Sequence, residues 1–111
     1  PALLGETTRS TGTGVEAAVR EMIQAAEAEG VARALEAMRD RPDSRPILGT
    51  IRVSTLVLVG DQDTLTPVEE SEAICNEVSG SRLEVIPNAG HLSNLEAPNA
   101  FNRALKTFLD G

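Results

Sequence analysis

The 111-residue sequence contains no Trp and no Tyr, and its only aromatic residues are two Phe. Proteins that bind single-stranded nucleic acid usually stack its bases on aromatic side chains. The chain is also poor in basic residues, with ten Lys and Arg against seventeen Asp and Glu, and its formal charge is −7. A negative field repels phosphate backbones and anionic membrane surfaces. We therefore expect neither nucleic acid nor a membrane as a partner.

Cysteine and long hydrophobic runs are equally scarce. The single cysteine, Cys75, excludes a disulfide within the chain, which is typical of a reducing compartment. No apolar run approaches the roughly 18 residues of a membrane-spanning helix. The length corresponds to one domain or to part of one. We expect a cytoplasmic chain, and a start at Pro1 without Met favours a piece of a longer protein.

The first 46 residues predict a loop followed by two amphipathic helices. Residues 1–13 are rich in Thr, Gly and Ser, which is typical of a loop or frayed terminus. Thr13 and Glu16 stand at capping-box spacing, which predicts a helix from Gly14, and Gly30 is placed to end it. Apolar residues recur at helical spacing in both segments: Val15, Val19, Met22, Ile23 and Ala26, then Val31, Leu35 and Met38.

These two helices form a hairpin or a corner that cannot bury its own apolar faces. Their many Ala residues favour helix but offer little apolar area. The helices must therefore lie on something else. Packing onto the rest of this chain is one interpretation, and a lid over a pocket is the other.

The second half of the chain alternates between strand and helix. A linker with two prolines, residues 41–50, precedes the β-branched run Thr55–Val59, which is typical of a strand buried on both faces and which Gly60 ends. The remaining signals predict a helix from Thr66 as N-cap and Pro67 as first residue to about Val78, a strand at Leu83–Ile86, and a helix from about Pro98. The order β-α-β-α with short links predicts an α/β fold with parallel strands.

Two strands are too few for a stable parallel sheet, because such sheets normally contain several strands covered on both faces. One edge of the Thr55–Val59 strand would have unpaired N–H and C=O groups. We infer that the sequence was shaped inside a larger sheet. An isolated chain is expected to form a homodimer through its exposed strand edge or helix surfaces.

Polar residues follow both predicted strands, where α/β proteins place functional groups. Asp61 and Asp63 follow the first strand, and His91 follows the second. Parallel neighbours bring both turns to the same end of the sheet. A carboxylate there can orient a His ring and stabilise its imidazolium, and the His can transfer protons near neutral pH. Alternatively, both Asp residues could simply be turn formers and the His a solvated turn residue.

The segment from about Ile47 to Leu109 resembles the C-terminal part of an α/β-hydrolase. In that family an apolar strand is commonly followed by Gly-x-x-Asp and a Pro. The His commonly follows a Gly, with Glu-x-Pro shortly after it. The matching residues are Gly60, Asp61, Gln62, Asp63 and Pro67, then Gly90, His91, Glu96 and Pro98. The order acid then base also agrees with the family.

The resemblance implies roles for these residues and for the parts of the chain. Asp63 would be the acid of a catalytic triad, His91 the general base and Asp61 a turn former. Residues 1–46 would be the remnant of a cap domain with its linker, and residues 47–111 the C-terminal part of the core. Ser54 departs from the Pro that many relatives have before the strand, which does not touch the chemistry.

No Gly-x-Ser-x-Gly nucleophile elbow occurs in the sequence. Cys75 does not replace it, because a lone Cys in the middle of a helix is usually an apolar filler. The resemblance therefore implies a fragment of a serine-type hydrolase for esters, lactones or related acyl compounds, inactive alone for lack of nucleophile and oxyanion hole. Its partners would be the missing N-terminal half and a small-molecule substrate. No cofactor or metal is expected.

Other interpretations stay open at this level. The chain could be a non-catalytic interaction module that binds a partner through its open strand edge or its helices. Relatives with the same frame include dehalogenases, peroxidases and acyltransferases, and the nucleophile would distinguish them. A nucleotide-binding function is not supported, because no glycine-rich loop follows either strand. Glu96 alone would be read as a charge favourable to a helix N-terminus.

Overall fold

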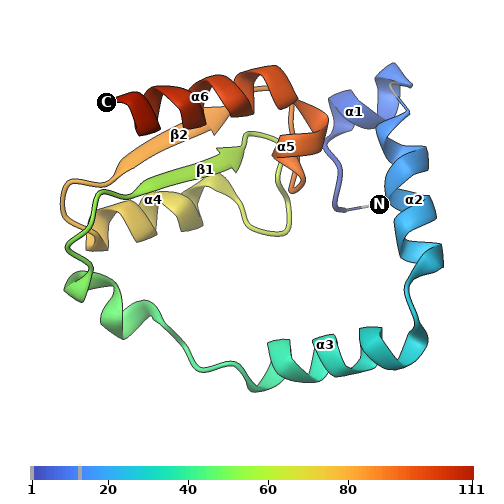
Figure 1. Cartoon of the computed structure of the whole chain (residues 1–111), viewed down its shortest axis with the longest axis horizontal. Helices are drawn as coiled ribbons and strands as arrows, with labels where there is room; N and C mark the ends of the chain where they lie inside the picture. Colours follow the sequence, from blue (N-terminus) through green and yellow to red (C-terminus); the bar gives the residue numbers. More distant parts are fainter. Residues whose placement is uncertain (1, 13) are drawn as a thin grey trace.

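The computed structural model describes residues 2–12 and 14–111, and it contains a small α/β unit preceded by an arc of helices (Figure 1). In chain order the elements are α1 (Glu6–Thr11), α2 (Val15–Ala25), α3 (Ala28–Asp40), η1 (Arg45–Thr50), β1 (Leu56–Gly60), α4 (Val68–Glu77), β2 (Arg82–Ile86), α5 (Ser93–Glu96) and α6 (Pro98–Asp110). Among the described residues, no helix is long and apolar enough to cross a membrane.

The two strands form a parallel sheet, as predicted. Their register runs from Leu56 opposite Arg82 to Gly60 opposite Ile86, so both strands end at the same sheet edge. Both α4 and α6 contact the two strands, and they lie on opposite sides of the sheet (Figure 1). This arrangement is typical of parallel strands, because βαβ connections place helices on the faces of the sheet.

The prediction that β1 is buried on both faces is only partly correct. Val59 and Gly60 are buried, but the first three residues of the strand are half-buried. Within the described part of the chain, β1 pairs with β2 alone. A strand that is apolar enough for the centre of a sheet thus lies at an edge, because residues 2–12 and 14–111 form a sheet of two strands.

The prediction of a loop over residues 1–13 is wrong for its second half, which forms α1. Gly5 precedes this helix without a side-chain cap. Tertiary contacts hold the segment instead: Leu4 and Thr8 are buried, and the Thr7 N–H donates to Gln62 Oε1 at 2.9 Å. The predicted N-cap Thr13 lies outside the described residues, and α2 begins at Val15 after Gly14, whose φ is 84°.

The prediction that Gly30 ends the first long helix is wrong. Ala26 and Glu27 have extended backbones that separate α2 from α3, and Gly30 lies inside α3. Glu27 is the N-cap of α3, since the Val31 N–H donates to its carbonyl at 3.0 Å. A glycine within an exposed helix costs only about 1 kcal/mol and need not end it. The two helices meet at a corner (Figure 1).

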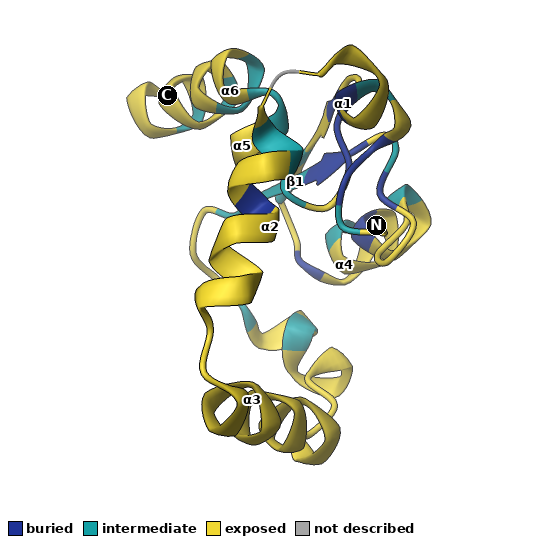
Figure 2. Ribbon diagram, turned by 90° about the vertical axis from the view of Figure 1, so that its right-hand side faces the viewer, coloured by how far each residue is buried: buried dark blue, intermediate teal, exposed yellow. Residues whose placement is uncertain are grey.

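Most of the apolar residues predicted to face a core from α2 and α3 are exposed. Val19 is buried, whereas large apolar side chains further along are on the surface, as Figure 2 shows by the exposed ribbon of both helices. These exposed side chains are Met22, Ile23, Val31, Leu35 and Met38. The described part of the chain therefore leaves these helix faces exposed. The division into residues 1–46 and 47–111 remains a prediction.

Smaller differences concern the connections. The linker after α3 is not wholly irregular, because its second part forms the 3-10 helix η1, with Pro46 in its first turn. The core that supports the strands is small. Its buried apolar residues are Leu4, Val19, Val59, Val78, Ile86 and Ala89. Val59 and Ile86 lie in the strands and Ala89 lies in the turn after β2, so half of these residues belong to the strands and that turn.

Candidate active site

Asp63 occupies the turn between β1 and α4, and its carboxylate organises that turn. Its Oδ1 accepts the backbone N–H groups of Leu65 and Thr66, both at 3.0 Å. Its Oδ2 accepts the Thr66 hydroxyl at 2.7 Å. This is the local backbone bonding for which Asp is favoured in turns. The side chain is only 4% exposed, so the turn holds a buried carboxylate in one orientation.

Thr66 and Pro67 do not start α4 as predicted. The helix begins at Val68, Pro67 is its N-cap, and no side chain caps its first turn. Pro67 has a non-helical ψ of 160°, and the Thr66 hydroxyl donates to Asp63 Oδ2. The pattern that predicted a helix start therefore marks a residue that holds the acid.

The structure brings His91 and Asp63, 28 residues apart, into direct contact. His91 Nδ1 lies 3.0 Å from Asp63 Oδ2 and 3.3 Å from Thr66 Oγ1. A carboxylate only accepts hydrogen bonds, so a bond between these atoms requires the proton on Nδ1. The neutral ring then has its lone pair on Nε2. The imidazole is 38% exposed, which leaves it accessible to a second group.

The environment of Asp63 favours its ionised form. Burial alone would raise the pKa of Asp63, but the hydrogen bonds from the Thr66 N–H, the Thr66 hydroxyl and His91 together outweigh it. The pKa of Asp63 therefore lies below its usual value of 3.8. At neutral pH a negative charge faces the protonated edge of the His91 ring, and this charge would stabilise an imidazolium.

Asp61 does not join this pair. Its Oδ1 accepts the Ala89 N–H at 3.4 Å, and its own N–H donates to the Ile86 carbonyl at 3.0 Å. The second of these bonds continues the backbone pairing of the strands into the turns. Asp61 therefore links the turn after β1 to the turn after β2.

Two residues near the pair were not assigned these contacts from the sequence. Gln62 binds the N-terminal segment: its Oε1 accepts the Thr7 N–H and its Nε2 donates to Thr7 Oγ1 at 2.7 Å. Glu96 accepts the N–H groups of Gly5 at 2.6 Å and Gly90 at 3.0 Å on Oε1, and that of Leu92 at 3.0 Å on Oε2. The prediction of Glu96 as a helix N-terminal charge does not describe these contacts. The place of Glu96 in the Glu-x-Pro motif is the feature of the sequence that could have pointed to these contacts.

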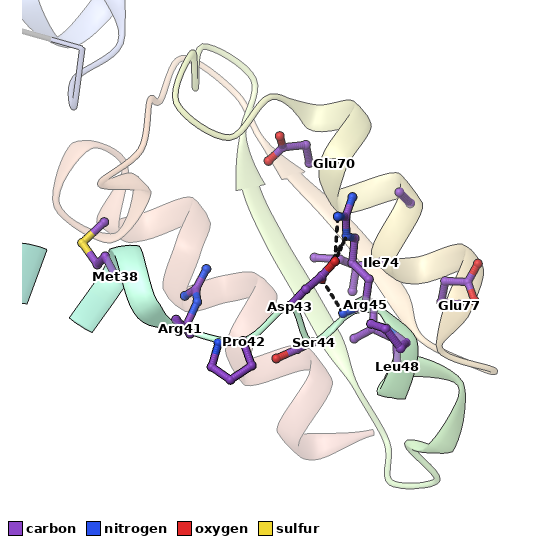
Figure 3. Close-up of a pocket in the computed structure, with 12 residues that line it drawn as sticks. Met38, Arg41, Pro42, Asp43, Ser44, Arg45, Leu48, Glu70, Ile74 and Glu77 are labelled. Carbon is purple, nitrogen blue, oxygen red and sulfur yellow. Dashed lines mark hydrogen bonds and ion pairs between the residues drawn. The ribbon is translucent and has the colours of Figure 1, made fainter. Parts of the chain in front are cut away.

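A hollow in the structure lies away from Asp63 and His91. It is an open space of about 1020 Å³ between the linker after α3 and one face of α4 (Figure 3). Arg45 pairs with Asp43 on one side of it, and Ile74 and Glu77 of α4 lie on the other. The candidate pair is thus not part of this hollow. Within the described residues no group of three His, Cys, Asp or Glu could hold a metal ion.

A parallel strand pair with an Asp–His contact across its carboxyl end is the geometry of one large class of enzymes. The family model described as "alpha/beta hydrolase fold" matches residues 17–98, and the chain belongs to this family. The α/β fold class and the similarity to part of such a core are thereby confirmed.

Named relatives are hydrolases. The 3-oxoadipate enol-lactonase 2 of Acinetobacter baylyi is 40% identical over 82 residues, which cover 74% of this chain and 30% of the relative. A solved thermophilic esterase from Thermogutta terrifontis is 40% identical with a TM-score of 0.95, over 99% of this chain and 40% of that one. A solved hydrolase from Pseudomonas aeruginosa PA01 is 37% identical with a TM-score of 0.82, over 93% of this chain and 38% of that one. The chain therefore spans less than half the length of these relatives.

Proposed function

We propose that the chain supplies the acid and base of a serine-type, cofactor-independent hydrolase for esters, lactones or related acyl compounds. The observation that carries the proposal is the 3.0 Å contact between His91 Nδ1 and the buried Asp63 carboxylate. The esterase and lactonase names of the similar proteins support the substrate class.

In this proposal His91 acts through the ring nitrogen that Asp63 leaves free. Nε2 removes the proton from a serine hydroxyl as that oxygen attacks the acyl carbon, and it later returns the proton to the leaving group. Asp63 holds the tautomer and stabilises the imidazolium. The exposed imidazole and the buried carboxylate suit this division of roles, since only the base must reach another group.

The nucleophile and the oxyanion hole must come from outside the 111 residues. The sequence contains no Gly-x-Ser-x-Gly segment. Without these groups, no nucleophile attacks the acyl carbon of the substrate and no N–H donors stabilise the oxyanion. We therefore propose that the chain alone is inactive, that the upstream half of a hydrolase completes the site, and that residues 1–46 are part of the cap.

A chimera tests the proposal directly. In the Thermogutta esterase, the segment that matches this chain would be replaced by the chain itself, and hydrolysis of a chromogenic ester would be measured. His91→Ala is expected to lower kcat on the order of 10⁴-fold or more, because the serine loses its base. Asp63→Asn is expected to lower kcat strongly as well, since the amide group cannot stabilise the imidazolium.

Asp61→Asn is the matched control, since it makes the same chemical change two residues away. It should leave kcat unchanged, because Asp61 contacts the Ala89 backbone and not His91. A folded, active chimera that keeps its kcat after His91→Ala would contradict the proposal. A folded chimera without activity before any substitution would contradict it too.

One observation favours an additional property, which is association through the uncovered helix faces. Leu35 and Met38 on α3 are 59% and 68% exposed. We propose that the isolated chain forms dimers through these faces or through the edge of β1 that does not pair with β2. When the remainder of the enzyme is present, we propose that the same surfaces contact it. Sedimentation of the chain as a monomer at micromolar concentration would contradict the dimer.

A further inference from the structure

The carboxylate of Glu96 is shared by backbone groups from two separate parts of the chain. Oε1 accepts the N–H groups of Gly5 and Gly90, and Oε2 accepts that of Leu92. A Glu that only capped α5 would bond to the residue that opens that helix, which is Leu92. The bonds to Gly5 and Gly90 reach beyond the helix. Glu96 therefore has a wider role than its place at the end of α5 requires.

Two of these donors flank the proposed base. Gly90 precedes His91 and Leu92 follows it, and both donate to the same carboxylate. The N–H of His91 itself donates to the carbonyl of Leu3 at 2.9 Å. Three consecutive backbone N–H groups are thus fixed, which sets the direction in which the His91 side chain leaves the backbone.

This backbone support matters because the ring has little other support. The imidazole is 38% exposed, and its side-chain hydrogen-bond partners are Asp63 and Thr66. A partly exposed imidazole keeps its 3.0 Å contact with Asp63 only if the Cα and Cβ of His91 are held in place. The hydrogen bonds from the Gly90 and Leu92 N–H groups to Glu96 hold these atoms in place.

The same carboxylate joins the N-terminal segment to the His turn at a place of close backbone approach. A Cβ on Gly90 would overlap the Gly5 nitrogen and would lie 2.8 Å from the Leu4 carbonyl carbon. Two backbones this close leave two N–H groups pointing into a small space, where Glu96 Oε1 accepts both. Bonds to a charged acceptor are stronger than bonds between neutral groups.

We propose that Glu96 is the positioning residue of His91, acting through the Gly90 and Leu92 backbone to set the distance between the base and Asp63. The catalytic importance of Glu96 rests on the proposed function, whereas the NMR test of the His91 ring position does not. A residue that only stabilised α5 would affect the stability of the chain without moving the His91 ring.

The test compares Glu96→Gln with the unsubstituted chain by NMR. A Gln side chain keeps one acceptor oxygen and puts an NH₂ group where the other was, so at least one N–H loses its acceptor. Amide hydrogen exchange at Gly90 and Leu92 is expected to become about tenfold faster or more. His91 is the only histidine, so its ring signals need no further assignment. They are expected to shift and broaden as the contact with Asp63 loosens.

Glu72→Gln is the matched control, because Glu72 lies exposed on α4 and the substitution removes the same charge. It should leave the His91 ring and the Gly90 amide unchanged. The amides of Leu65 and Thr66, which bond to Asp63, report whether Glu96→Gln acts locally and should keep their exchange rates. An unchanged Gly90 amide and an unchanged His91 ring in folded Glu96→Gln would overturn the proposal.

If Glu96→Gln unfolds the isolated chain, the chimera decides, since its larger core supplies more stability. The substitution is expected to lower kcat about tenfold or more with KM nearly unchanged, because the base is misplaced while the binding pocket is not. An equal kcat would overturn the inference. A chimera inactive before the substitution would instead count against the proposed function, and amide exchange at Gly90 and Leu92 in the folded chimera would still judge Glu96.

Discussion

Around the ends of β1 and β2, groups far apart in the sequence contact one another, whereas α2 and α3 carry most of their large apolar side chains on the surface. Both regions have a clear hydrophobic pattern. At the strand ends the contacts are short backbone hydrogen bonds and buried polar side chains. On the helices an apolar face has no matching surface among the described residues. The apolar spacing of α2 and α3 thus indicates helix, but it does not indicate whether the same chain covers the apolar face.

A glycine in each region gives the largest contrast. A Cβ on Gly60 would overlap the carbonyl oxygens of Ala89 and Gly90, whereas a Cβ on Gly30 in α3 would meet nothing within 4 Å. Gly60→Ala is expected to lower the free energy of unfolding by about 3 kcal/mol or more, because backbone atoms have to move. Gly30→Ala is expected to raise it by up to about 1 kcal/mol through helix propensity. Urea unfolding followed by circular dichroism measures both.

Equal effects of the two glycine substitutions would show that the strand ends are no more tightly packed than the helices. The intact secondary structure of each variant, checked in the absence of urea, is the control for this comparison.

Two valines sharpen the contrast at a smaller scale. Val78 after α4 is 1% exposed, and Val31 in α3 is 45% exposed. Val78→Ala is expected to cost about 2 to 3 kcal/mol, since two buried methyl groups are lost and a cavity remains. In the dissociated monomer, Val31→Ala should change the free energy of unfolding by no more than about 0.5 kcal/mol. A cost at Val31 as large as that at Val78 would show that the α3 face is covered in solution.

A further contrast concerns pH and tests the buried charge at the strand ends. Because the pKa of Asp63 is lowered on folding, its ionisation stabilises the folded chain above the usual pKa of 3.8, and this contribution is lost as the pH falls through the folded pKa. At pH 7, Asp63→Asn is expected to cost about 1.5 to 3 kcal/mol, the range for hydrogen bonds to a charged group.

The difference between the original chain and Asp63→Asn should shrink as the pH falls below 3.8. Thermal unfolding at a series of pH values measures this. A constant difference across the series would show that the charge of Asp63 does not contribute.

Much of the α/β unit could be predicted because its signals are local. The apolar run before Gly60 and the turn residues after it are enough to place β1 and Asp63. The parallel pairing follows from the alternation of elements, and it brings Asp63 close to His91. The catalytic roles of both residues stay predictions, as no measurement of activity tests them.

The remaining differences have separate physical origins, and only the first is a contact between distant segments. Residues 6–11 form α1 where the composition indicated a loop, because Thr7 bonds to Gln62, 55 residues away. Thr66 was assigned to a helix start, although its hydroxyl bonds to Asp63. The break between α2 and α3 falls at Ala26 and Glu27, where the sequence has neither Gly nor Pro. Local propensity does not indicate hydrogen-bond partners such as Gln62 and Asp63, and it did not indicate the position of this break.

The turns after β1 and β2 are joined mainly by main-chain bonds. The Asp61 N–H donates to the Ile86 carbonyl at 3.0 Å, and the Gln62 N–H donates to the Ala89 carbonyl at 2.8 Å. Bonds of this kind do not use the side chains of Asp61 and Gln62, although they need the close backbone approach at Gly60. The spacing between acid and histidine can therefore survive extensive sequence drift, and anyone grafting this pair onto another scaffold would have to transplant both turns together as one cassette.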